Sequence, residues 1–208
     1  MNQEQKIRYF LKIFKKAENK YKKSSKRLSA EGWSQDWQVL IATIMSAQSR
    51  DETTIPIAEQ LFQKYLTLKQ LAEAFNSDVL HIFKSLNYNR TKAKNVVAAA
   101  RFLVENYNGK VPQEIAQLQE IPGVGRKTAN LVLSEIHKQQ TITVDTHVHQ
   151  IANSLGLVKT KLRDKTELEL QKIVPKSYWN RINRIFVLWG KDVPSHKKEK
   201  LLKKLDEK

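Results

Sequence analysis

The chain of 208 residues contains no cysteine. It therefore has no disulfide bond, and it cannot supply thiolate ligands to a zinc site or to an iron–sulfur cluster. Long hydrophobic runs are also absent, because no stretch of 18 apolar residues occurs, and residues 1–10 lack the apolar segment of a secretory signal. We expect a cytoplasmic protein without a membrane partner, associated with the nucleoid if the source is prokaryotic.

Glycine and proline, the residues that most often interrupt helices, are scarce, with 6 and 5 copies. Between them, apolar residues recur with the period of 3.6 residues that is typical of a helix with one buried face. Three segments show this pattern most clearly: Trp37, Leu40, Ile41, Ile44 and Met45; Val96, Val97, Ala100, Leu103 and Val104; and Ile182, Ile185, Phe186 and Trp189. We predict an all-α protein whose core contains these three stripes.

Acidic residues are few compared with basic ones. The chain has 37 Lys and Arg against 21 Asp and Glu, a net charge of +16, and a sequence pI near 9.9. Such a balance favours a polyanionic partner such as nucleic acid. Solubility or a lysine-rich genome would explain the same composition, so charge alone does not decide the function.

Residues Ile115–Ile136 have the pattern of a helix, a tight hairpin and a second helix. The hairpin, Pro122–Gly125, leads directly into the second helix at Arg126. Glycines permit positive φ and close backbone approach, and the amides of a helix N-terminus attract phosphate. Many helix caps contain glycine, but the complete segment is more specific and predicts an anion site that reads no sequence.

Lys127 lies in the first turn of that second helix. The positive end of the helix dipole and the neighbouring Arg126 both disfavour a protonated amine, and a neutral amine is a nucleophile. Taken alone, Lys127 is better explained as a surface lysine that touches phosphate.

Asp145 follows a short β-prone segment, Thr141–Val144, and we expect it to cap the next helix. A capping aspartate usually has no other role. An ionised carboxylate facing an amine would, however, stabilise a cationic sugar and accept protons.

Residues 118–130 (LQEIPGVGRKTAN), followed by VDTHV at 144–148, closely resemble the endonuclease III family of helix-hairpin-helix DNA glycosylases. The resemblance extends through LIATIMSAQSRD (40–51), KAKNV (92–96) and NGKVP (108–112) to Gly156, and more faintly to FVLWGK (186–191). It implies two helical domains that flank a DNA-binding cleft. The first is a six-helix barrel at 29–139, with the helix-hairpin-helix at about 113–136. The second consists of 1–28 and 140–208.

The resemblance also implies roles for individual residues. Lys127 matches the lysine that forms a Schiff base, and Asp145 matches the catalytic aspartate. Gln48 matches a glutamine that fills the gap left by an extruded nucleotide, with burial at a helix end as its alternative. The remaining expected DNA contacts are Gly123, Val124, Gly125, Arg126, Thr128 and His147. In related glycosylases the hairpin carbonyls, here those of Gln119, Ile121 and Val124, can hold a cation, which is not required.

Several positions depart from the family pattern. Asn87-Tyr88-Asn89 stands where Gly-Leu-Tyr is usual, so an aromatic replaces a leucine wedge, with core packing as the alternative for Tyr88. The adenine-specific relatives have serine in place of Lys127 and glutamate in place of Thr43, so adenine excision is not expected. Gln150 and Ser154 replace arginines, which removes some phosphate contacts.

The largest departure is the missing four-cysteine cluster, which would begin near Pro194. We expect residues 195–208 to form a lysine-rich helix instead, with Leu201, Leu202 and Leu205 on one face, and we expect no cofactor. The favoured function is a bifunctional glycosylase and abasic-site lyase that removes oxidised pyrimidines from damaged double-stranded DNA as a monomer. Excision of thymine or uracil from mismatches with G, and a non-catalytic DNA-binding module, are the alternatives.

Overall fold

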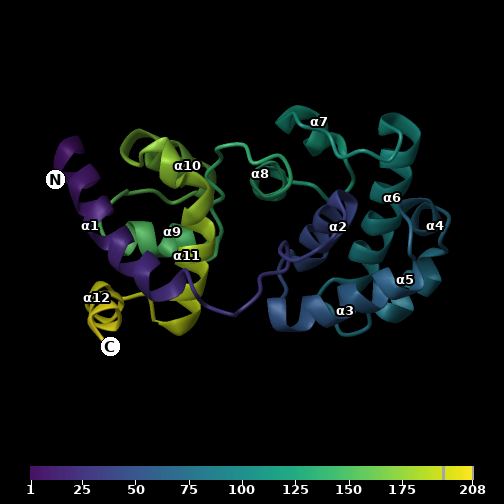
Figure 1. The fold of residues 1–208 in the computed structure, drawn as a ribbon, viewed down its shortest axis with the longest axis horizontal. Coiled ribbons are helices and arrows are strands. Elements are labelled where there is room, and N and C mark those ends of the chain that lie inside the picture. The colour runs from purple at the N-terminus through teal and green to yellow at the C-terminus, as the bar shows by residue number, and fades with distance from the viewer. Residues whose placement is uncertain (194, 208) are drawn as a thin grey trace. The chain divides into compact units, whose positions relative to one another are not determined.

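The computed structural model describes residues 1–193 and 195–207. Within these residues the chain forms twelve α-helices and one 3-10 helix, and no β-strand (Figure 1). The all-α fold predicted from the sequence is confirmed. None of the described helices is long and apolar enough to cross a membrane. The chain divides into two compact units, one of Arg27–Gln139 and the other of Met1–Lys26 with Gln140–Lys208.

The unit of residues 27–139 is built around α2 (Asp36–Ser46), which packs against α3, α6 and α8. The predicted stripe from Trp37 to Met45 lies in the core, and Leu40, Ile41 and Met45 are fully buried. The other helices of this unit are α3 (Asp51–Lys64), α4 (Leu68–Ala72), α5 (Asn76–Ile82), α6 (Asn89–Tyr107), α7 (Ile115–Glu120) and α8 (Arg126–Glu135).

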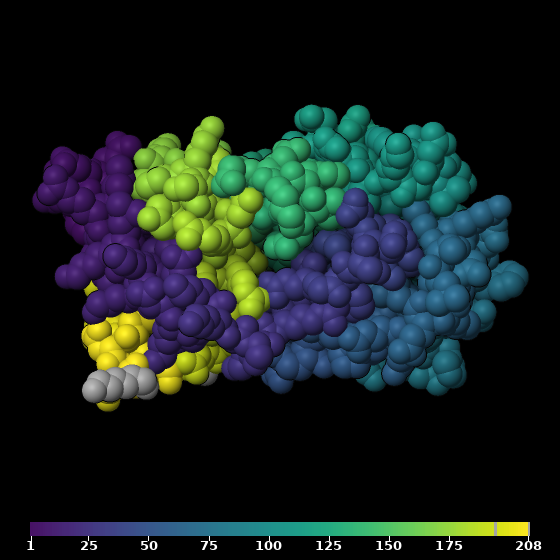
Figure 2. Space-filling view, viewed as in Figure 1, coloured from purple at the N-terminus to yellow at the C-terminus, as the bar shows by residue number. Residues whose placement is uncertain are grey.

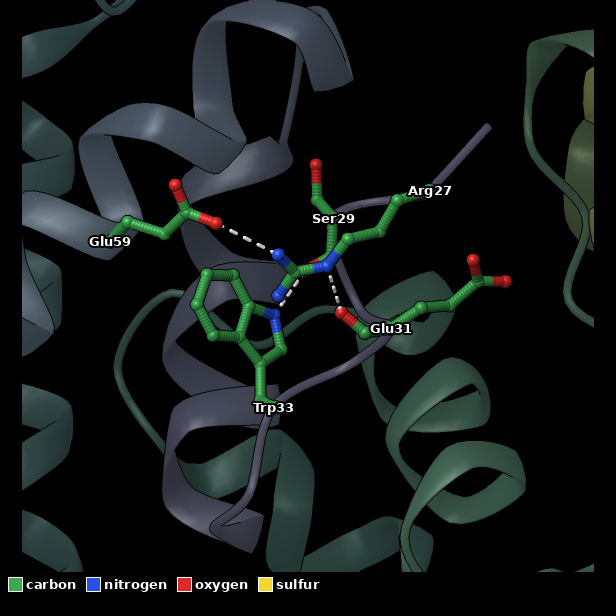
Figure 3. A network of polar contacts seen from close by, with 5 residues as sticks. All are labelled: Arg27, Ser29, Glu31, Trp33 and Glu59. Carbon is green, nitrogen blue, oxygen red and sulfur yellow. Dashed lines mark hydrogen bonds and ion pairs between the residues drawn. The ribbon is translucent and has the colours of Figure 1, made fainter. Parts of the chain in front are cut away.

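The start of this unit is fastened by the side chain of Arg27 (Figure 3). Its guanidinium lies 4.0 Å from the centre of the Trp33 ring, donates from Nε to the Glu31 carbonyl at 2.6 Å, and pairs with Glu59 at 2.9 Å. The Trp33 indole in turn donates to the Ser29 carbonyl at 2.7 Å. Because Glu59 belongs to α3, this network ties the first residues of the unit to its second helix.

The second unit packs α1 (Gln3–Tyr21) against α11 (Trp179–Asp192) and α10 (Arg163–Ile173). Its core is aromatic: the rings of Phe10 and Phe14 stack at 5.2 Å, and Phe186 contacts both Phe14 and Trp189. The unit is completed by α9 (Thr146–Ser154), the 3-10 helix η1 (Lys176–Tyr178) and α12 (Lys198–Asp206).

The lysine-rich C-terminal helix forms as α12, although Pro194 and Lys208 lie outside the described residues. Leu201 is fully buried, while Leu202 and Leu205 are half-buried. Lys16 of α1 pairs with Asp206 at 2.6 Å, and the surfaces of α1 (purple) and α12 (yellow) lie side by side (Figure 2). Apolar packing with a surface ion pair therefore secures this helix.

Candidate functional site

The turn between α7 and α8 is held tightly against its own unit. Gly123 has φ +83°, and an added Cβ would lie 3.0 Å from Asn95 Cβ and 3.1 Å from Ile44 Cγ2. Val124 is buried, and its amide donates to the Ile121 carbonyl at 3.0 Å. Glycine is thus required at 123 both by conformation and by close packing on α2 and α6.

Gly125, two residues later, is glycine for a different reason. It caps α8 with extended backbone (φ −95°), which any residue adopts, and an added Cβ would meet no atom within 4 Å. Packing inside the protein therefore does not select glycine here. Its missing side chain leaves open access to the first amides of α8, which have no helical partner and attract anions.

Lys127 is the second residue of α8 and is half-buried. Arg126 precedes it and is also half-buried, whereas Thr128 is only 7% exposed. The side chain of Thr128 therefore faces the core, and its expected contact with DNA stays a prediction. The hairpin and α8 bring together all of the predicted phosphate-binding residues from Gly123 to Thr128.

Asp145 caps α9, as predicted, and its Oδ1 accepts a hydrogen bond from the Val148 amide at 2.9 Å. The residue is half-buried. This cap needs one carboxylate oxygen, which leaves Oδ2 for other chemistry. The capping role predicted from the residue type and its position is therefore confirmed.

The extended segment before Asp145 is fastened by two asparagines of α11 that sequence patterns did not reveal. Asn180 accepts from the Thr141 amide at 3.1 Å, and Asn183 donates to the Thr143 carbonyl at 3.3 Å. Asn183 is buried at 8% exposure. These bonds fix the path of the backbone that leads to Asp145 at the start of α9.

His147 is packed between α11 and the segment that precedes α12. Its Nδ1 lies 3.1 Å from Nε2 of His196. A Cβ at Gly190 of α11 would collide with His147 Nδ1, so only glycine leaves room for this ring. Burial, followed by the charge of His147, lowers the pKa of His196. His147 thus has a hydrogen-bonding role within its unit, and its expected contact with DNA stays a prediction.

Gln48 and Tyr88 are both exposed, and both have left-handed backbone, with φ values of 53° and 56°. Tyr88 is 64% exposed. The alternatives of a buried glutamine and a tyrosine in the core are therefore wrong. Left-handed backbone is unfavourable for such residues, and strained backbone of this kind clusters at functional sites.

Lys92 and Ser49 are further residues that the sequence did not identify as part of this region. Lys92, on α6, is only 5% exposed, and its Nζ donates to Ser49 Oγ at 2.6 Å. Burial lowers the pKa of the Lys92 amine from 10.5 to about 8. A lysine held in this way must have a structural or functional reason, because burying an ammonium group is costly.

Other positions singled out in the sequence have structural roles or lie at the surface. Thr43 is buried, and its hydroxyl donates to the Val39 carbonyl at 2.7 Å. Gln150 is exposed and Ser154 is half-buried. Among the described residues, no group of three or more His, Asp or Glu side chains could hold a metal ion.

Residues 41–176 match the family model described as HhH-GPD superfamily base excision DNA repair protein. Because this match covers more than half of the chain, the protein belongs to that superfamily. Individual relatives narrow the assignment further. Endonuclease III of Thermotoga maritima is 42% identical over 157 residues, which are 76% of this chain and 74% of that one. Endonuclease III of Buchnera aphidicola is 36% identical over 173 residues, 83% of each chain.

Solved structures agree with these relatives. A trapped endonuclease III–DNA covalent intermediate has a TM-score of 0.83 at 29% identity, covering 92% of this chain and 87% of the other. A thermostable thymine-DNA glycosylase, with a TM-score of 0.74 at 17% identity over 89% of this chain and 86% of the other, shares the fold. The protein is a member of the endonuclease III family, a DNA N-glycosylase with abasic-site lyase activity.

Proposed function

We propose that Lys127 is the nucleophile and Asp145 the assisting carboxylate with which this enzyme removes oxidised pyrimidines from duplex DNA. The observation that carries this assignment is the position of Lys127 in the first turn of α8, directly after an open glycine cap. An amine placed there lies beside the amides that would bind the phosphate backbone of the same strand. Asp145, an anchored carboxylate at a helix start, acts on the same sugar.

DNA binding precedes the chemistry. The hairpin amides from Gly123 to Thr128 and the guanidinium of Arg126 hold phosphates, which gives affinity without sequence preference. The damaged nucleotide must leave the base stack to reach an enzyme active site. Gln48 and Tyr88, both exposed, fill the space that it leaves.

The covalent step then exchanges one bond for another. The amine of Lys127 attacks C1′ as the glycosidic bond breaks, and the departing base takes up the proton that Asp145 removes from the amine. Asp145 stabilises the cationic sugar and accepts a proton from the amine. The C1′–O4′ bond then breaks as a C1′=N bond forms, and the remaining proton of the amine passes to O4′. This ring-opened Schiff base loses a proton from C2′, the C3′–O bond breaks with the phosphate as leaving group, and the strand is nicked on the 3′ side. Hydrolysis then frees Lys127, and no cofactor is consumed.

A cation at the hairpin would have a supporting role only. The carbonyls of Gln119, Ile121 and Val124 are oxygen ligands of the kind that hard cations prefer. Ile121 already accepts from the Val124 amide, but a carbonyl oxygen has a second lone pair. Such an ion would bridge the hairpin to a phosphate, and no step of the reaction depends on it.

The trapping of a covalent adduct tests the lyase assignment. Borohydride reduces a Schiff base to a stable amine, so incubation with abasic duplex DNA should give a protein–DNA adduct of reduced mobility in a denaturing gel. A protein that only tethers DNA gives no adduct. The similar endonuclease III structure is itself a trapped covalent intermediate with DNA, which supports the same chemistry here.

Substrate choice is tested by a panel of defined duplexes. We expect cleavage at thymine glycol and at other oxidised pyrimidines to exceed cleavage at thymine or uracil opposite G. Thymine or uracil opposite G is the second candidate substrate class, because Tyr88 places an exposed aromatic where the family usually has leucine. Strong cleavage at G·T with none at thymine glycol would replace the first class by the second.

Binding should depend steeply on salt. If several Lys and Arg displace counterions, affinity for abasic duplex falls by about 10²- to 10³-fold between roughly 50 and 200 mM salt. Arg126→Gln should reduce the slope of log Kd against log salt by about one. Fluorescence anisotropy with a labelled duplex measures both, and an affinity that is unchanged across this range contradicts the electrostatic account.

A further inference from the structure

Two loops of the unit 27–139 carry the exposed side chains that enter the DNA in the proposed function. The first, between α2 and α3, contains Gln48, and the second, between α5 and α6, contains Tyr88. Both residues have positive φ. Because this backbone conformation is unfavourable for residues with side chains, something outside each residue must hold it.

A direct hydrogen bond joins the two loops. Asn87 Nδ2 donates to the Gln48 carbonyl at 2.9 Å, across 39 positions of sequence. The bond therefore holds the backbone of Gln48 in place, and its donor, Asn87, is the neighbour of Tyr88 in the other loop. The donor is the side chain of Asn87, and a glycine at this position could not make the bond.

Lys92 makes a second connection between the same loops. Its backbone amide donates to the Tyr88 carbonyl at 3.0 Å, and its Nζ donates to Ser49 Oγ at 2.6 Å. The bond from the backbone amide opens α6 and would be made by other residues at this position, so what Lys92 itself adds is its buried side chain, which ties the first turn of α6 to Ser49, the residue that follows Gln48. Its burial, together with the lowered pKa of its amine, indicates that the connection is maintained despite its cost.

We propose that Asn87 and Lys92 are positioning residues that lock the two loops together, so that Gln48 and Tyr88 enter the DNA as one preformed unit that selects the base opposite the lesion. This inference rests on the proposed function. A preformed pair presents the amide of Gln48 to the orphaned base in one orientation, whereas separate loops could adapt to several bases. Preorganisation of this kind lets the enzyme favour one opposite base over the others, because only that base fits the fixed amide of Gln48.

The principal test compares Asn87→Ala with Asn106→Ala. Asn106 is also exposed and also donates from Nδ2 to a backbone carbonyl, that of Phe102, but both residues lie in α6. For thymine glycol opposite each of the four bases, we expect Asn87→Ala to reduce the ratio of the highest to the lowest kcat/KM by about threefold to tenfold. We expect Asn106→Ala to leave this ratio unchanged.

A spectroscopic measurement separates positioning from a general loss of stability. 2-Aminopurine placed opposite a tetrahydrofuran abasic analogue becomes brighter when it is unstacked, so its fluorescence follows the insertion of the two loops. Asn87→Ala should slow the fluorescence rise, while Asn106→Ala should not. Lys92→Met keeps most of the length of the buried chain and removes its donor, and it should slow the rise in the same way.

If Asn87 acts by positioning Gln48, the effect of Asn87→Ala on discrimination must depend on the Gln48 side chain. In a Gln48→Ala background, Asn87→Ala should change the discrimination ratio by less than about twofold, because the side chain to be positioned is gone. Suppose that Asn87→Ala, in a protein that retains Gln48, shows the same discrimination ratio and the same fluorescence rise as the unaltered protein, and that borohydride trapping is normal. The proposed connection between the loops is then wrong, and the lyase assignment stands. If trapping fails in the unaltered protein, the proposed function itself is wrong.

Discussion

Replacing Lys127 by glutamine is expected to abolish the borohydride-trapped adduct and to lower strand nicking by about 10³-fold or more, as removal of a nucleophile does. Glutamine is a good helix former, and the position is half-buried, so α8 should persist. Single-turnover nicking of a preformed abasic site measures the loss. Binding of the same duplex should weaken only as far as the loss of one positive charge dictates.

Arg126→Gln is the matched control for this prediction. It removes the same charge from the adjacent residue of the same helix turn. It should weaken DNA binding and still give the full amount of trapped adduct when protein is saturating. If Lys127→Gln and Arg126→Gln behave alike, Lys127 is a phosphate contact and another amine is the nucleophile.

Asp145→Asn should lower base release by about 10²- to 10³-fold while leaving the fold intact. Asparagine caps helices as well as aspartate, and its side-chain oxygen can accept the Val148 amide as Oδ1 does now. The charge is thus removed without removing the cap. Single-turnover release of thymine glycol and thermal unfolding report the two properties separately.

Asp145→Ala gives the complementary variant. It loses both functions, so it should show the same deficit in base release together with a loss of stability of about 1 kcal/mol from the missing cap. An Asp145→Asn protein with nearly full activity would show that this carboxylate only caps α9 and takes no part in the reaction.

The parts of the fold that are predictable from the sequence depend on neighbours along the chain. The stripe of α2, the hairpin before α8 and the cap at Asp145 are each specified within a few residues. Not every helix start is specified in this way: Phe75 caps α5 without a side-chain bond, and Asn76, a residue type common at caps, is the first residue of the helix.

The supporting contacts cannot be predicted in this way, because their partners are distant in sequence. Asn183 reaches the carbonyl of Thr143, and His196 reaches His147, 49 positions away. Asparagine and histidine occur in many surroundings, so no periodicity distinguishes these two from surface residues. The exposure of Tyr88 is likewise undecided by sequence, because an aromatic residue two positions after Leu86 could also pack in the core, and the left-handed turn that exposes it is seen only in the structure.

Gly123 and Gly125 are separated by one residue and are indistinguishable as letters, yet the structure places them under different kinds of selection. The first is fixed by what lies inside the protein, Asn95 and Ile44, and the second has no protein atom near its missing Cβ. A library of variants sorted for folded protein alone would therefore keep Gly123 and accept many residues at 125. Sorting the same library for repair would restore glycine at 125, so the two screens together would separate the demands of folding from those of the DNA.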